Sequence, residues 1–347
     1  MNSETDPLLT VEDLGVSFAT EDGVVRAVDG VSFELRAGEV LAIVGQSGCG
    51  KSVTAQTIMG LTRSPNAEFS GSIHFGETEL VRAPEETLRA IRGEEIAMVF
   101  QDPMTSLHPV YRVGWQIAEQ IRAHGDVSEA DARGRAIELL AEVGIPNPAK
   151  RVDSYPHELS GGMRQRAMIA MALANRPRVL IADEPTTALD VTIQAQIIAL
   201  LDDLRGELGS VVLITHDLGV VAEIADRVLV RYAGMVVEQG ERDAIFHDPQ
   251  HPYTWGLLGS IPRLDRPAGG RLPSIAGAPP SLLHRPEGCA FRPRCPHAFD
   301  RCGELPALEP RAEPAHLDRC WLDVEAKRAR RVVDGQIGLR ADTEAVS

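Results

Sequence analysis

A glycine-rich octapeptide constrains the fold of this chain more than any other feature. It reads Gly45-Gln46-Ser47-Gly48-Cys49-Gly50-Lys51-Ser52, and it lies between the apolar segment Val40–Val44 and a helical pattern that runs from Lys51 to about Leu61. This is the G-x-x-x-x-G-K-[ST] spacing in the strand-then-helix context that a phosphate-binding loop requires. Glycines let backbone N–H groups turn inward around phosphate oxygens, and the helix N-terminus adds partial positive charge. The alternative is a glycine-rich turn without a chemical role, which an eight-residue match with the correct flanking segments disfavours.

The loop predicts a nucleoside triphosphate site. Lys51 is expected to reach the β- and γ-phosphates, and Ser52 is expected to ligate Mg²⁺. Cys49 fills a variable position of the loop and needs no redox role. The predicted ATP-binding residues in this segment are Gly45, Ser47, Gly48, Cys49, Gly50, Lys51, Ser52 and Val53.

A second segment carries the acids that such a site needs. The apolar run Val179–Ala182 ends in Asp183 and Glu184. Asp183 at the carboxyl end of a strand is placed to hold Mg²⁺, the Walker B role. Glu184 is placed to polarise a water against the γ-phosphate as general base. Two acids that only solubilise a strand end are the alternative.

Periodicity outlines the rest of the domain. Residues 8–44 and 71–100 alternate as strands do, whereas residues 102–175 have the three- and four-residue spacing of helices. The short apolar runs indicate a parallel sheet covered on both faces. The expected strands are Leu8–Val16, Val31–Leu35, Val40–Val44, Ile96–Phe100, Val179–Ala182 and Val211–Thr215, and the expected helices are Val113–Ala123, Ser128–Val143, Gly162–Ala174 and Thr192–Leu208.

Charge and hydropathy argue against several classes of protein. The 35 basic and 50 acidic residues give a net charge of -15, which opposes binding to a nucleic-acid backbone. No apolar stretch approaches the roughly 20 residues of a membrane-spanning helix. Residues 1–10 have no apolar core typical of a signal peptide. The chain is therefore expected to stay in the cytosol.

The segment Leu159-Ser160-Gly161-Gly162-Met163-Arg164-Gln165 lies about twenty residues before the acidic strand end. It resembles the signature motif of ATP-binding-cassette (ABC) proteins, with Met163 where glutamine is usual. This resemblance implies that two domains stack head to tail. Leu159, Ser160, Gly161, Gly162 and Met163 would then contact the ATP held by the phosphate loop of a second ATPase subunit.

Further positions match the family in order along the chain. Gln101 resembles the Q-loop glutamine, which contacts the metal or the water and couples to membrane subunits. Ala188-Leu189-Asp190 resembles the D-loop, with Asp190 at the dimer interface, and His216 resembles the switch histidine that holds the γ-phosphate. Phe18 is the candidate for stacking on adenine, although a phenylalanine in a strand is more often part of the core.

Finer features resemble the D-type ATPases of oligopeptide and dipeptide importers. They are 101–107, the run 183–192, and His251-Pro252-Tyr253-Thr254-Trp255 with the residues that follow it. The resemblance spans about residues 8–325 and implies a membrane-associated translocase. Its partners would be a second ATPase subunit, with a paralogue favoured, two transmembrane permease subunits and an extracytoplasmic solute-binding protein. Nickel importers share this branch, and a soluble cassette ATPase or a non-hydrolysing regulatory module are more distant alternatives.

Four of the five cysteines, Cys289, Cys295, Cys302 and Cys320, crowd the proline-rich last quarter of the chain. In a reducing cytosol such a cluster indicates metal binding before disulfides. Their spacings lack the C-x₂₋₄-C knuckle of common zinc sites. Four thiolates in bent loops suit a [4Fe–4S] cluster, and the peptide-importer resemblance includes these cysteines. Zinc and free thiols remain alternatives.

Together these features predict an α/β P-loop NTPase with a RecA-like core, an antiparallel β portion and an α-helical subdomain at about 102–165. The expected domains are a nucleotide-binding domain at 1–260, a loop-rich C-terminal extension with the cysteine module at 261–325, and a fraying tail at 326–347. The expected location is the cytoplasmic face of the cell membrane.

Overall fold

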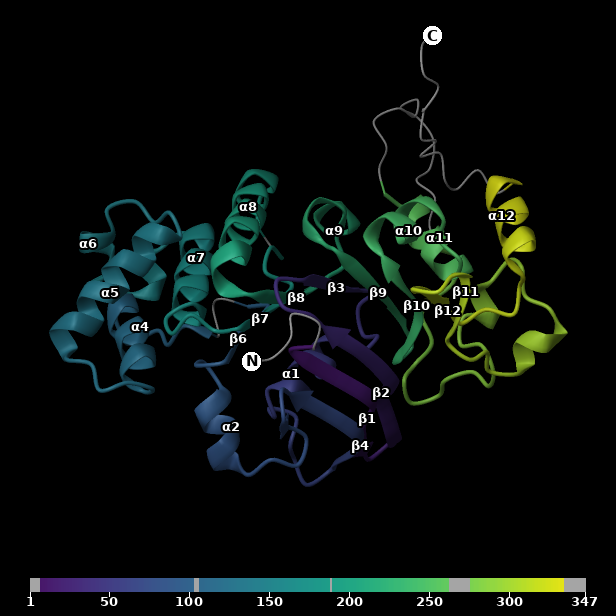
Figure 1. The fold of residues 1–347 in the computed structure, drawn as a ribbon, viewed down its shortest axis with the longest axis horizontal. Helices are drawn as coiled ribbons and strands as arrows, with labels where there is room; N and C mark the ends of the chain where they lie inside the picture. The colour runs from purple at the N-terminus through teal and green to yellow at the C-terminus, as the bar shows by residue number, and fades with distance from the viewer. Residues whose placement is uncertain (1–6, 103–105, 188, 262–274, 334–347) are drawn as a thin grey trace, which may run out of the picture.

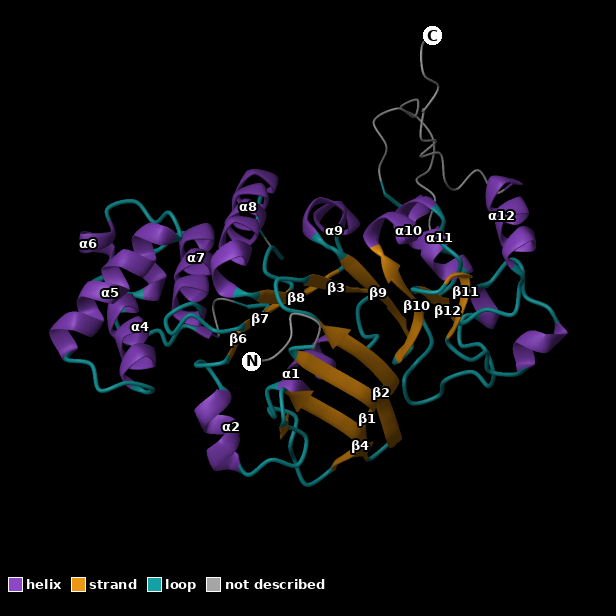
Figure 2. Ribbon diagram, in the orientation of Figure 1, coloured by secondary structure: helices purple, strands orange, loops and turns teal. Residues whose placement is uncertain are grey.

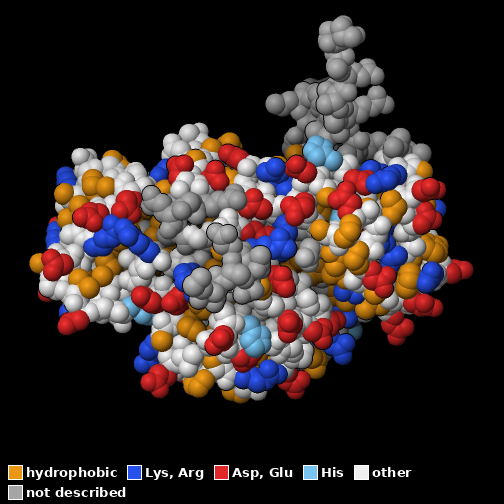
Figure 3. Space-filling view, in the orientation of Figure 1, with side chains coloured by type: hydrophobic (Ala, Val, Ile, Leu, Met, Phe, Trp, Pro, Cys, Tyr) orange, Lys and Arg blue, Asp and Glu red, His pale blue; other side chains and the backbone are white. Residues whose placement is uncertain are grey.

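The fold places two sheets between a group of helices and a C-terminal segment. The structure, a computed structural model, describes residues 7–102, 106–187, 189–261 and 275–333, without the side chains of 204–208. Helices α4 to α7 lie at one end and the segment from α10 to α12 at the other (Figure 1). Acidic and basic side chains are interspersed over the face shown in Figure 3. No helix in the described parts of the chain combines the length and apolar character needed to span a bilayer.

The larger sheet carries the strands that flank the phosphate loop. Its order is β11-β12-β10-β9-β3-β8-β7-β6. The strands from β9 to β6 are parallel, as the apolar runs predicted, and β10, β12 and β11 continue the sheet in antiparallel pairing. The bounds are β3 Val40–Val44, β6 Ile96–Val99, β7 Val179–Asp183, β8 Ser210–Thr215, β9 Arg227–Tyr232, β10 Met235–Glu241, β11 Glu309–Glu313 and β12 His316–Asp318.

The smaller sheet is the predicted antiparallel portion. Its order is β2-β1-β4-β5, with β1 Leu9–Thr20, β2 Gly23–Leu35, β4 Ala67–Phe75 and β5 Thr78–Glu79. β1 and β2 are longer than predicted because they pair along their whole length in a hairpin, from Leu9 with Leu35 to Thr20 with Gly23. The pairing satisfies backbone groups that hydropathy alone does not reveal.

Most helices lie beside the larger sheet, and α1 and α2 lie near the smaller one (Figure 2). In chain order they are α1 Lys51–Ile58, α2 Glu85–Ile91, α4 Val113–Arg122, α5 Glu129–Glu142, α6 Pro148–Arg151, α7 Gly161–Ala172, α8 Val191–Leu208, α9 Leu218–Ile224, α10 Arg242–His247, α11 Pro252–Gly259 and α12 Val324–Val333. Single 3₁₀ turns cover Pro156–Glu158, Arg292–Arg294 and Asp300–Gly303.

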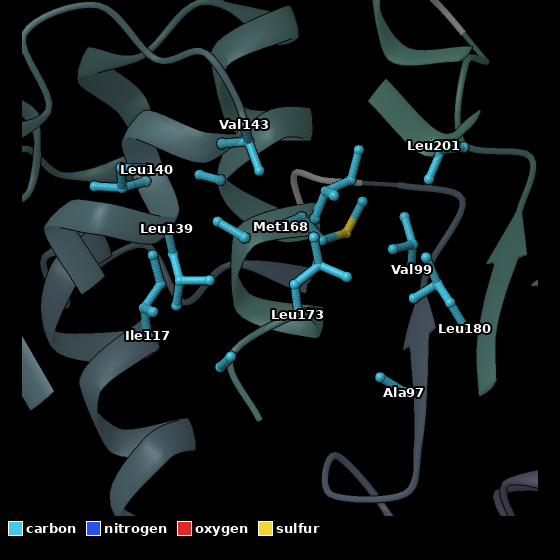
Figure 4. Close-up of a cluster of buried hydrophobic side chains, with 14 of the residues drawn as sticks. Ala97, Val99, Ile117, Leu139, Leu140, Val143, Met168, Leu173, Leu180 and Leu201 are labelled. Atoms are coloured by element: carbon cyan, nitrogen blue, oxygen red, sulfur yellow. The ribbon is translucent and has the colours of Figure 1, made fainter. Parts of the chain in front are cut away.

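The parallel strands are buried on both faces, as strand β7 illustrates. Leu180 and Ala182 join the core that contains the helices α4, α5 and α7, and Figure 4 shows Leu180 close to Val99 beside that helical group. Val179 and Ile181 join the core that contains the smaller sheet. Side chains alternate between the faces of a strand, so both cores fix the position of this strand and of the acids at its end.

The C-terminal residues join the larger sheet instead of standing apart from it. β12 pairs with β10, with Glu238 opposite Asp318, and β11 forms the sheet edge. Pro310 lies in β11, where an edge strand tolerates a missing N–H. The tail was expected to fray from residue 326, but residues 324–333 form α12. Lys327 of this helix is fully buried and donates to both carboxylate oxygens of Asp318 at 2.7 Å.

Candidate active site

The phosphate loop connects β3 to α1 with a backbone that only glycine adopts readily. Gly45, Gly48 and Gly50 have φ angles of 152°, 77° and 90°. A Cβ on Gly50 would lie 1.9 Å from the carbonyl oxygen of Ala27, which excludes any larger residue. Gly50 is the N-cap of α1, so the first free N–H groups of this helix belong to the loop. The loop therefore has the backbone that its motif predicted.

Lys51 bonds back to the start of this loop, whereas Ser52 bonds to the end of β7. The buried Lys51 Nζ donates to the carbonyl oxygens of Gly45 at 2.8 Å and Gln46 at 3.4 Å. Ser52 Oγ donates to Asp183 Oδ1 at 3.1 Å, which joins the loop to the end of β7. Burial raises the pKa of Asp183 above its usual range, and the hydrogen bond from Ser52 opposes this shift.

Glu184 is the centre of a polar cluster at the end of β7. Its Oε2 accepts hydrogen bonds from Gln101 Nε2 at 3.1 Å and from Thr187 Oγ1 at 2.9 Å. Its Oε1 lies 3.3 Å from Nδ1 of His216, which follows β8. Glu184 itself has a φ of 49°, unusual for a residue other than glycine. Such strain persists only where surrounding contacts hold it, and it is concentrated at functional sites.

A cavity of about 400 Å³ lies between the phosphate loop, Gln101 and Glu184. Its polar end is formed by the phosphate loop, Gln101 and Glu184, and its apolar end includes Phe18, Val25 and Leu282. The predicted Phe18 thus lies at the same cavity as the loop. The complete lining is Phe18, Val25, Ala27, Ser47, Gly48, Gly50, Lys51, Ser52, Val53, Gln101, Glu184 and Leu282.

The signature segment lies outside this cavity. Ser160 is the N-cap of α7, and its Oγ accepts a hydrogen bond from the N–H of Met163 at 3.3 Å. Ser160 and Gly161 are exposed, and a Cβ added to Gly161 would meet open space. Leu159, by contrast, is part of the core. Asp190 caps α8 by accepting from Ile193 N at 3.0 Å, whereas Ala188, and residues 103–105 of the predicted Q-loop segment, lie outside the described residues.

Comparisons with known proteins agree with this arrangement. The ABC transporter family profile matches residues 28–187, and the profile of the oligopeptide/dipeptide transporter C-terminal region matches residues 237–302. The chain is 52% identical over 319 residues to the oligopeptide transport ATP-binding protein OppD of Salmonella typhimurium, covering 92% of this chain and 94% of that protein. It is 54% identical over 303 residues to the dipeptide transport ATP-binding protein DppD of Escherichia coli, covering 87% and 92%. The chain belongs to the ATP-binding proteins of the oligopeptide and dipeptide ABC transporters.

A solved structure supports the same ABC fold. The dimeric, post-hydrolysis form of the ATP-binding cassette MJ0796 bound to ADP and Pi matches with a TM-score of 0.61 and 27% identity. The match covers 67% of this chain and 98% of that one, so part of this ABC protein extends beyond the shared cassette.

The four C-terminal cysteines line one small cavity together with His251, Phe291 and other residues. It offers about 10 Å³, the space of roughly one water molecule. Burial raises the pKa of Cys295 to about 11 and that of Cys320 to about 12. In the described residues, no group of three or more His, Cys, Asp or Glu side chains is positioned to hold a metal ion. The predicted [4Fe–4S] cluster is therefore not supported by this arrangement.

Sequence reasoning missed a residue that bonds Glu184 and two residues that line the cavity. Thr187 is within the predicted acidic segment, but only the fold shows that it bonds Glu184. Val25 and Leu282 have no motif, and Leu282 comes from the C-terminal segment. The pairing of Leu282 with β2, where its carbonyl oxygen accepts from Arg26 N at 3.4 Å, brings it there. No signal in the sequence predicted this contact.

Proposed function

We propose that this chain binds and hydrolyses ATP to power the import of dipeptides or oligopeptides through an ABC transporter. The observation that carries the proposal is the convergence of Gln101, Thr187 and His216 on the Glu184 carboxylate, at the cavity of the phosphate loop. Peptides are favoured as the solute because the similar proteins are named for oligopeptide and dipeptide transport. A nickel or other solute importer with the same ATPase is the second candidate.

In this proposal ATP spans the cavity from its apolar to its polar end. The adenine stacks on Phe18, with Leu282 on the same apolar side, and the triphosphate lies on the loop from Gly45 to Val53. Lys51 leaves its carbonyl partners to neutralise the β- and γ-phosphates. The cavity end near Ser52 and Asp183 supplies hydroxyl and carboxylate oxygens, the hard donors that Mg²⁺ prefers.

The polar cluster around Glu184 is proposed to hydrolyse the bound ATP. Mg²⁺, held by Ser52, Asp183 and Gln101, would offset the charge of the phosphates. Glu184 accepts a proton from the attacking water as general base, and His216 donates a hydrogen bond to the γ-phosphate. Gln101 and Thr187 keep the Glu184 carboxylate oriented through their hydrogen bonds. Most of the rate enhancement comes from this fixed positioning and charge.

We further propose that the site is completed by a second ATPase subunit. The exposed Ser160 and Gly161 at the start of α7 offer hydroxyl and N–H donors to an anion, yet they are outside this chain's own cavity. Opposed head to tail, two subunits would place this segment, Leu159 to Met163, on the ATP of the partner, with Asp190 at the interface. The D-type resemblance favours a paralogue as that partner.

We also propose three parts for this chain and an assembly with other subunits. The nucleotide-binding domain is placed at 1–260, the extension at 261–325 and the tail at 326–347. The helical subdomain, about 102–165, would contact two permease subunits from the cytoplasmic face of the membrane. An extracytoplasmic solute-binding protein would deliver the peptide. No nucleic acid takes part.

The experiment that tests this function isolates the intact complex through a tag on this chain. We expect two multi-span membrane proteins and a second ATPase to co-purify, and membrane vesicles bearing the complex to take up peptide only with Mg-ATP. Mass spectrometry of the bound solute distinguishes peptide from nickel. Ser160→Arg is the matched variant, and it should reduce hydrolysis about 100-fold while ATP still binds the separate subunit. A soluble complex without permeases would contradict the transport function, and full activity of Ser160→Arg would contradict the shared site.

We also propose that Cys289, Cys295, Cys302 and Cys320 bind a [4Fe–4S] cluster, with zinc as the alternative. All four line a single cavity, and Arg319 lies close enough to Cys289 to influence its pKa, as suits a cluster with net negative charge. A cavity of about 10 Å³ is too small for the cluster, so binding requires the cysteine side chains to move apart.

Anaerobically purified protein distinguishes these alternatives. An iron–sulfur cluster gives a brown protein with iron, sulfide and broad visible absorbance that dithionite bleaches, and Cys295→Ser should lose it. Colourless protein with one zinc per chain would contradict the cluster. Metal-free protein with four reactive thiols would contradict both.

A further inference from the structure

Gln46 of the phosphate loop is held by residues more than two hundred positions away. Its backbone N–H donates to the hydroxyl of Tyr253 at 2.9 Å. Its side-chain oxygen Oε1 accepts from Nη1 of Arg294 at 2.8 Å. Gln46 is not among the residues that line the nucleotide cavity, so these contacts approach the loop from outside.

Arg294 is itself fixed in place. Its Nε donates to the carbonyl oxygen of Ala276 at 2.8 Å, and its Nη2 to that of Ile275 at 3.3 Å. Nη1 also donates to the hydroxyl of Tyr232 at 3.2 Å, and the guanidinium lies 5.8 Å from the centre of that ring. A planar guanidinium with several donors can hold these acceptors at once, which an ammonium group cannot.

The backbone of Gln46 connects the Arg294 contact to Lys51, which is expected to bind phosphate. The carbonyl oxygen of Gln46 is 3.4 Å from Lys51 Nζ, and its neighbour Gly45 accepts from the same nitrogen at 2.8 Å. A rotation of the backbone at Gln46 would move the carbonyl oxygens of Gly45 and Gln46, together with the N–H groups of the residues that follow. Donors that are already in position bind an anion without a free-energy cost of rearrangement during binding.

We infer that Arg294 is a positioning residue for the ATP site, acting through Gln46 to hold the phosphate loop in its phosphate-binding conformation. The inference rests on the proposed ATP binding. It assigns to the C-terminal segment a part in nucleotide affinity, separate from any group held by the cysteines. Loss of Arg294 should therefore weaken binding most for the ligands that place the most phosphates on the loop.

The test measures dissociation constants of ATP and AMP for the full-length protein, by competition with a fluorescent ATP analogue. Arg294→Ala should weaken ATP binding about tenfold, the size of one hydrogen bond to a charged group, and should leave AMP binding unchanged. General disruption of the C-terminal segment would displace Leu282 from the nucleoside end of the cavity and would weaken both ligands equally, which would overturn the inference.

Two further variants separate the Gln46 contact from other effects. Gln46→Ala should weaken ATP binding as Arg294→Ala does, and the double variant should be no weaker than either, because both changes remove one contact. Arg301→Ala is the matched control, since Arg301 adjoins Cys302 as Arg294 adjoins Cys295 but stacks on Trp321, 3.8 Å from the ring centre. Additive losses, or an equal loss in Arg301→Ala, would overturn the inference. Wild-type protein that binds no ATP would instead refute the proposed function.

Discussion

Replacement of Glu184 by glutamine tests the hydrolytic mechanism with the least disturbance of the structure. Glutamine has the shape of glutamate and keeps one side-chain oxygen that can accept from Gln101 and Thr187, which now bond Oε2 at 3.1 and 2.9 Å. The new amide group would lie near His216 Nδ1, which is 3.3 Å from Oε1. The change thus removes the negative charge and the basicity while it preserves packing.

The expected loss follows from the role of a general base. Such a group contributes about 10²–10⁴-fold to a rate, or about 2.7–5.5 kcal/mol of barrier. Glu184 is only 9% exposed, and no basic side chain other than His216 pairs with it among the described residues, so we expect a value in the upper half of that range. The affinity for ATP should change by less than about threefold, because the groups that hold the phosphates are untouched.

The assay is release of inorganic phosphate at saturating Mg-ATP, with ATP affinity measured in parallel. Glu223→Gln is the control, since it neutralises an exposed glutamate on α9 and should leave turnover unchanged. Turnover by Glu184→Gln above about a tenth of the wild-type rate would refute the assignment of the general base.

Two other predictions address the nucleoside contact and the C-terminal helix. Phe18→Ala should weaken ATP binding about fivefold through loss of stacking but leave tripolyphosphate binding unchanged. A competition assay measures both affinities, and equal losses of affinity for the two ligands would show that Phe18 belongs only to the core. Lys327→Met should lower the free energy of unfolding by about 3–5 kcal/mol, because it leaves Asp318 buried without its main partner. Chemical denaturation measures this loss of free energy. The double variant, with Lys327→Met and Asp318→Asn, should recover most of the lost stability. A loss under about 1 kcal/mol in the single variant would contradict the role of the pair.

Local patterns predicted the centre of the fold well. The strands β3, β7 and β8 appeared as short apolar runs, because a strand covered on both faces has no polar side. The loop between Gly45 and Ser52 was predictable because its backbone angles require glycine at fixed positions. The helices α4, α5 and α7 were found from their spacing, with bounds shifted by a few residues.

The C-terminal part shows where such patterns fail. Prolines indicated loops, yet Pro310 lies in the edge strand β11, and α12 includes residues 326–333, where fraying was expected. Both elements depend on tertiary partners. β11 pairs with β12, which in turn pairs with the distant β10, and Lys327 of α12 bonds the buried Asp318, nine residues earlier. Neither partner can be identified from the local sequence of the element that needs it.

The sequence by itself determined which residues are candidates for the chemistry, since a phosphate loop, a strand ending in two acids and a signature helix start are each local arrangements with a local physical cause. Only the tertiary structure decided which of them meet. Gln101 and His216 reach Glu184 because β6, β7 and β8 are neighbours in the sheet, and Leu282 and Arg294 reach the nucleotide site because the C-terminal segment packs against β2 and the phosphate loop. Such contacts join residues 32 to 248 positions apart, and strand order and burial, not residue pattern, bring them together.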